Sequence, residues 1–214
     1  LDATVLYNKI LEQENKLSQD NFTILKTYFY LSRNDYFHAI LELKLLSEDT
    51  DLFFQFLLAE LYNITGKTRA AYTIFKEIYA KDKYYPNLVN SIVYSLRDSE
   101  NKEEQFYWIK KGLEINPYDP VLVQHLANYY TWTEDYIASA QQWKMLYDMT
   151  GDLFFSVLCE INYILASADR SQLHNIHVWV EEKVTNYPQY ADEINSRIGI
   201  IIFNKIHPED ALFY

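Results

Sequence analysis

The sequence predicts an all-α protein built from stacked helix–turn–helix units. Turn-forming residues are scarce, because the 214 residues contain only 4 glycines and 5 prolines, and a β-sandwich or barrel needs many tight turns. A regular spacing is also present: Pro86 and Pro120 lie 34 residues apart, as do Pro117 and Gly151. Each proline precedes a segment of apolar periodicity, where a first helical position tolerates its missing N–H.

The predicted helices follow one another in pairs joined by short turns. The pairs are expected over 21–33 with 36–47, 52–64 with 68–81, 86–97 with 101–114, 120–132 with 135–148, and 153–167 with 172–186. A helix over 2–16 is expected before them, and another over 189–205 is expected to end at His207-Pro208. Pro208 to Asp210 predicts the start of one more helix. Apolar ends where polar caps are expected indicate a fragment of a longer protein.

Residues of matching size recur in a frame that starts near 20, 52, 86, 120 and 154. The unit from 52 contributes Leu58, Ala59, Tyr62, Gly66, Ala71 and Phe75, and the unit from 120 contributes Leu126, Ala127, Tyr130, Ser139 and Trp143. These residues resemble the tetratricopeptide repeat (TPR) family, whose consensus has small residues at positions 8 and 20, Tyr near 11, a turn glycine near 15 and an aromatic residue at 24. The small residues let the two helices of a unit approach closely.

The resemblance implies a right-handed superhelical solenoid of about five TPR-like helix–turn–helix repeats with flanking helices. A single hairpin cannot bury its apolar face alone, so neighbouring hairpins must stack. We therefore expect a single solenoid over 1–214, with repeats near 20–51, 52–85, 86–119, 120–153 and 154–188 and extra helices over 2–16 and 189–205.

Charge and composition exclude several classes of function. The formal net charge of −11 argues against a nucleic-acid partner, because phosphate contacts need clustered Lys and Arg. The sequence contains no run of eighteen apolar residues, so no membrane-spanning helix is expected. Cys159 is the only cysteine, which excludes an intrachain disulfide and a cysteine metal cluster. We expect a soluble segment, cytoplasmic or periplasmic. The sequence begins at Leu1 rather than Met, as a mature form or an excised fragment would, and any targeting information would then be missing.

The resemblance implies a partner-binding groove lined by positions 2, 5, 9 and 12 of the first helix in each unit. Amide side chains there pair with the N–H and C=O groups of an extended peptide. The candidate partner-binding residues are Asn63, Asn90, Tyr94, Arg97, Gln124, Asn128 and Asn162. Only Arg97 supplies a cation on this face and Glu60 opposes an anion, so an acidic peptide tail is not the expected ligand of the groove.

Other chemistry-bearing residues are expected to serve structure. His174, His177 and Glu181 share one face of a predicted helix at a spacing that suits a metal, yet ordinary surface histidines are the expected reading. Cys159 is expected to be a buried apolar residue. The four tryptophans are expected in cores or helix seams, and a second binding surface is expected only if Trp108 and Trp132 are exposed near one edge. No catalytic residue, metal or cofactor is expected.

Three functional hypotheses follow from these patterns. The first is a non-catalytic protein–protein interaction scaffold that binds an extended peptide or a helix of a partner and belongs to a larger complex. The second is a scaffold of a bacterial envelope assembly for polysaccharide export or secretion, because residues 126–152 are similar to repeats of such exporters. The third is the substrate-recruiting arm of an enzyme whose catalytic domain lies outside this sequence.

Overall fold

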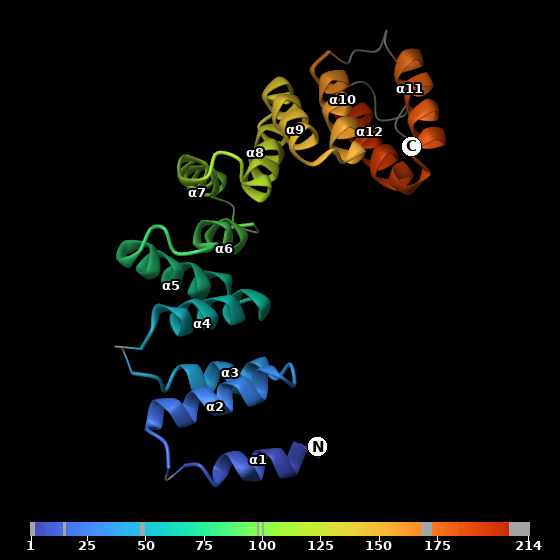
Figure 1. Cartoon of the computed structure of the whole chain (residues 1–214). Coiled ribbons are helices and arrows are strands. Elements are labelled where there is room, and N and C mark those ends of the chain that lie inside the picture. Colours follow the sequence, from blue (N-terminus) through green and yellow to red (C-terminus); the bar gives the residue numbers. More distant parts are fainter. Residues whose placement is uncertain are drawn as a thin grey trace. The chain divides into compact units, whose positions relative to one another are not determined.

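Apolar periodicity without strand signals produces an all-α structure, as the sequence predicts. The computed structural model describes residues 3–14, 16–47, 50–97, 99, 101–167 and 173–205, which form twelve α-helices and a 3₁₀ helix (Figure 1). Within these residues the most extensive helix–helix contacts join helices that are neighbours in the chain. The chain divides into two compact units, 1–108 and 109–214, and each is described by itself.

The first unit contains six helices and the beginning of a seventh. They are α1 (Ala3–Leu11), α2 (Gln19–Leu31), α3 (Tyr36–Leu43), α4 (Leu52–Ile64), α5 (Thr68–Lys81), α6 (Leu88–Ser95) and the start of α7 (Lys102–Ile115). Helix α2 packs on α3 and α4 packs on α5, while α4 also contacts α6. Ala59 on α4 and Ala71 on α5 are both fully buried, as expected where small residues let two packed helices approach closely.

The second unit contains the rest of α7 and the remaining helices. They are α8 (Pro120–Trp132), α9 (Tyr136–Thr150), α10 (Leu153–Ser167), α11 (Leu173–Asn186), the 3₁₀ helix η2 (Pro188–Tyr190) and α12 (Ala191–Lys205). Helix α9 packs against both α8 and α10, and α10 also contacts α12. The core of this unit centres on Trp143, which is buried and stacked on Phe155 with 5.9 Å between ring centroids.

Most predicted helices are found within two residues of their expected bounds, and only α1 and α3 differ by more. Helix α6 begins at Leu88 because Asn87 adopts a left-handed backbone (φ 59°), so the expectation that Pro86 opens this helix is wrong. Pro120 does occupy the first turn of α8, behind the Asp119 cap. Helices α1 and α3 end earlier than predicted, at Leu11 and Leu43. The expected break at His207-Pro208 and the helix after it lie outside the described residues.

One turn geometry recurs between the two helices of three hairpins. Asn34, Gly66 and Glu134 have positive φ angles of 58°, 77° and 61°. In each case the next residue donates its backbone N–H to the carbonyl oxygen of a tyrosine five residues earlier. The N–O distances are 3.0 Å for Asp35 to Tyr30, 2.7 Å for Lys67 to Tyr62 and 2.9 Å for Asp135 to Tyr130. The three left-handed residues are spaced by 32 and 68 residues, and this closure satisfies carbonyls at the end of the first helix.

Candidate partner-binding site

Three of the predicted partner-binding residues lie on one side of α6 and the turn that follows it. Asn90, Tyr94 and Arg97 are spaced four and three residues apart, which places them on one helical face. The Tyr94 side chain is 46% exposed, and the Arg97 guanidinium lies 3.9 Å from the centroid of its ring. Asn90 is half-buried. The group therefore exposes an aromatic ring with a cation stacked on it, beside a partly buried amide, and Tyr and Arg are enriched in protein interfaces.

Asn63, predicted to face a partner, is buried in the seam between α4 and α6. Its amide oxygen accepts a hydrogen bond of 2.9 Å from the Ser95 hydroxyl, and its amide nitrogen lies 3.5 Å from the Ser91 carbonyl oxygen. The neighbouring Ser91 hydroxyl donates to the Glu60 carboxylate. These side chains join two first helices to each other, so Asn63 is not accessible to a partner in this arrangement.

Asn162, in the second unit, is also buried between two helices. Its amide nitrogen donates to the Leu158 carbonyl oxygen at 2.9 Å, and its amide oxygen accepts from the Thr131 hydroxyl at 3.3 Å. The side chain is 1% exposed. Thr131 belongs to α8 and Asn162 to α10, so this polar contact also joins two first helices across 31 residues of sequence.

The exposed predicted residues of the second unit lie on α8. Gln124 and Asn128 are four residues apart on one face and both are exposed. Trp132, a further turn along the same helix, is 58% exposed, and Val121 at the other end is 46% exposed. This face combines amide groups, which suit a peptide backbone, with apolar groups, which suit side-chain contacts.

The four tryptophans differ in their surroundings. Trp143 is buried, and Trp179 is half-buried with its Nε1 donating to Glu160 at 2.8 Å. Trp108 is only 6% exposed and its Nε1 donates to the Tyr72 hydroxyl at 3.0 Å. Trp132 is exposed whereas Trp108 is not, so the condition for a second surface made from these two residues is not met.

Potential metal ligands do not cluster in the part of the chain that the structure describes, and the one thiol is buried. Among the described residues, no group of three or more His, Cys, Asp and Glu is arranged to hold a metal ion. Cys159 is buried, and burial raises the pKa of its thiol, which favours the unreactive protonated form. Burial has the same effect on His125 of α8, where it favours the neutral form and therefore lowers the pKa of the imidazole. No described helix is long and apolar enough to cross a membrane.

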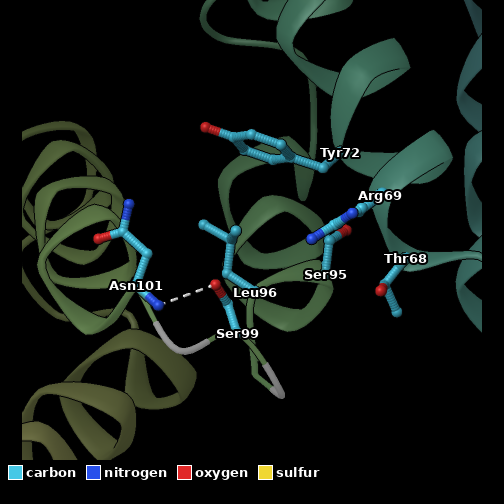
Figure 2. A pocket seen from close by; sticks show the side chains of 7 residues that line it. All are labelled: Thr68, Arg69, Tyr72, Ser95, Leu96, Ser99 and Asn101. Atoms are coloured by element: carbon cyan, nitrogen blue, oxygen red, sulfur yellow. Dashed lines mark hydrogen bonds between the residues drawn. The ribbon is translucent and has the colours of Figure 1, made fainter.

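A pocket of about 490 Å³ lies in the first unit, where α5, α6 and the turn before α7 meet. Figure 2 shows Asn101 on one side and Thr68 and Arg69 on the other, with Ser95 and Leu96 between them and Tyr72 above. A second hollow of about 320 Å³ continues along α5, lined by Tyr72, Thr73, Lys76, Glu77 and Ala80. No pattern in the sequence predicted a site at these residues.

No protein-family model matches the chain, and no curated protein sequence matches it.

Proposed function

We propose that the chain is a non-catalytic protein-interaction scaffold of the tetratricopeptide-repeat kind, which binds an extended peptide or a helix of a partner protein. The recurring hairpin turn supports the repeat assignment. The same left-handed residue and the same hydrogen bond to a tyrosine carbonyl occur three times, at sequence spacings of 32 and 68 residues, close to one and two repeat lengths. Polar contacts between successive first helices support it too, because Ser95–Asn63 and Thr131–Asn162 bridge 32 and 31 residues in the two units.

The observation that carries the binding role is the exposure of mixed aromatic and amide faces on the first helices. Tyr94 with its stacked Arg97 lies beside Asn90 on α6, and Gln124 with Asn128 lies on α8. Large exposed apolar groups rimmed by hydrogen-bonding side chains are typical of protein-binding surfaces. Asn63 and Asn162 support these faces from the interior by fixing the spacing of adjacent helices.

The test uses peptides selected on the intact chain from a random displayed library. The strongest binders are then measured against Asn90→Ala with Tyr94→Ala, and separately against Gln124→Ala with Asn128→Ala. A peptide that occupies either face should lose about tenfold or more in affinity for the matching pair. Loss of Tyr94 removes an aromatic anchor, and loss of Gln124 and Asn128 removes amides that pair with the peptide backbone.

Asn8→Ala on α1 removes an exposed amide outside these faces and serves as the control. It should leave affinity unchanged, and all variants should keep the wild-type helical circular dichroism. If every selected peptide binds both face variants as tightly as the unchanged chain, the first-helix faces are not the binding site.

A further inference from the structure

Positive charge is concentrated in one short stretch of this acidic chain. Residues 67–83 contain five cations, Lys67, Arg69, Lys76, Lys81 and Lys83, against two carboxylates, Glu77 and Asp82. The stretch has a net charge of +3 within a chain of −11. It covers helix α5 and its two ends, whereas the predicted groove positions lie on first helices such as α4 and α6.

Two of these cations share an exposed face of α5 with small side chains. Arg69, Thr73, Lys76 and Ala80 are spaced by four, three and four residues, and all are exposed. Among the described residues no carboxylate forms an ion pair with Arg69 or Lys76. Lys76 instead lies 5.2 Å from the centroid of the Tyr72 ring. Their charges are therefore available to an external anion.

Tyr72 forms a fixed wall between the two hollows on this face. Its hydroxyl donates to the Glu104 carboxylate and accepts from Trp108 Nε1 at 3.0 Å, both on α7. Glu104 also accepts from the Asn101 amide at 3.3 Å, so both of its carboxylate oxygens are engaged. Arg69 lines the hollow on one side of Tyr72, and Lys76 lines the hollow on the other side, together with Glu77.

We propose that the α5 surface formed by Arg69, Tyr72, Thr73 and Lys76 docks a carboxylate-bearing extended segment of a partner protein. Arg69 and Lys76 are seven residues apart, so their backbones are separated by about 10 Å along the helix. Two acidic residues three positions apart in an extended peptide span about 10 Å as well. A segment with that spacing places one carboxylate in each hollow, with its backbone passing over the Tyr72 ring.

Charge also decides between a peptide and a nucleic acid as the occupant. A polyphosphate chain extends far beyond the few cations of this face and meets the acidic remainder of the molecule. Two carboxylates on a short segment are matched by two cations and need no wider positive surface. This surface is distinct from the first-helix faces, and its ligand is the acidic class that the groove disfavours.

The experiment measures binding of a fluorescent eight-residue peptide to the full chain by anisotropy. The peptide carries two glutamates three positions apart among small neutral residues, and a second peptide has glutamines in their place. Arg69→Gln with Lys76→Gln should weaken glutamate-peptide binding about tenfold, as expected for the loss of two exposed charge contacts. About 1 M salt, which shortens the screening length to about 3 Å, should have a similar effect.

The matched control, Lys9→Gln with Lys44→Gln, removes the same charge from exposed lysines of α1 and from the end of α3. It should change affinity less than about twofold, since distant exposed charges are screened. Reversal by Arg69→Glu with Lys76→Glu should transfer binding to a peptide with lysines at the two positions. Asn90→Ala with Tyr94→Ala should leave glutamate-peptide binding intact, which separates this surface from the first-helix faces.

Three results would overturn the docking surface. The first is equal loss of binding in the Lys9/Lys44 control, which would indicate a response to net charge alone. The second is unchanged binding after Arg69→Gln with Lys76→Gln, in a chain whose circular dichroism is intact. The third is displacement of the peptide by a single-stranded oligonucleotide at lower concentration than by unlabelled glutamate peptide, which would assign the face to phosphate.

Discussion

The Ser95 hydroxyl on α6 donates a 2.9 Å hydrogen bond to the Asn63 amide oxygen on α4, and both side chains are buried. The two residues are 32 positions apart and belong to successive first helices. Buried polar groups cost free energy unless they are paired, so this contact favours one register of α4 against α6. Thr131 and Asn162 make the corresponding link between α8 and α10 at 3.3 Å.

Removal of one partner from this buried pair should destabilise the first unit. Ser95→Ala leaves the Asn63 oxygen without its donor and should lower the free energy of unfolding by about 1–3 kcal/mol. Ser95→Ala combined with Asn63→Leu should cost less than the sum of the two single changes, because the apolar pair leaves no unsatisfied group. Urea denaturation of the full chain measures both effects.

Asn21→Ala, at an exposed position of α2, is the control for this pair and should stay within about 0.5 kcal/mol of the unchanged chain. Strict additivity of the Ser95 and Asn63 changes would contradict the coupling that the hydrogen bond implies.

The left-handed turn residues predict opposite effects of two substitutions. Gly66 has φ 77° and an added Cβ would meet no atom within 4 Å, so Gly66→Ala should cost about 1 kcal/mol from backbone strain alone. Glu134 holds φ 61° with a side chain, so Glu134→Gly should stabilise by about 0.5 kcal/mol after the added entropy of the unfolded chain is subtracted. Thermal and urea unfolding test the pair, and a change of the same sign at both sites would refute the argument.

Tyr72 should make the chain less stable at high pH. Burial, followed by its bond to Glu104, raises the pKa of Tyr72 from 10.0 to about 12. Between these values the folded state retains a proton that the unfolded state releases, so stability is full below pH 10 and falls as pH rises toward 12. Tyr72→Phe cannot ionise and should lose less stability than the unchanged chain over that interval.

Unfolding in urea at several pH values from 8 to about 11.5 would show this difference. Tyr118→Phe, at an exposed position, should reproduce the pH dependence of the unchanged chain. Identical curves for Tyr72→Phe and the unchanged chain would show that Tyr72 ionises alike in both states.

Local sequence signals predicted the helices well because each signal acts within a few residues. Pro120 stands in the first turn of α8 behind the Asp119 cap, and the left-handed Gly66 follows the end of α4. Pro86 misled because the left-handed conformation of Asn87 moved the helix start to Leu88. Such local capping and turn preferences can be read from the sequence, whereas the backbone conformation of a single asparagine cannot.

The candidate site was harder to predict, because burial depends on the helix that packs alongside. Asn63 and Tyr94 are both on faces that the repeat frame assigns to the groove, yet Asn63 is buried and Tyr94 is exposed. The difference lies in Ser95, 32 residues beyond Asn63, whose hydroxyl brings the amide into the seam. The basic α5 face was visible as five cations in 67–83, but its hollows depend on how α7 holds Tyr72.

Cys159 should report on local opening of α10. Its side chain is 9% exposed, and burial together with the neighbouring Glu160 raises the pKa of the thiol. Alkylation requires the thiolate, so iodoacetamide at pH 8 should modify the folded chain on the order of a hundredfold more slowly than the chain in urea. Ala166→Cys in a Cys159→Ser background places a thiol at an exposed position of the same helix, and it should react at nearly the unfolded rate. Equal rates for the two thiols in the folded chain would mean that Cys159 is accessible and that the core around α10 opens readily.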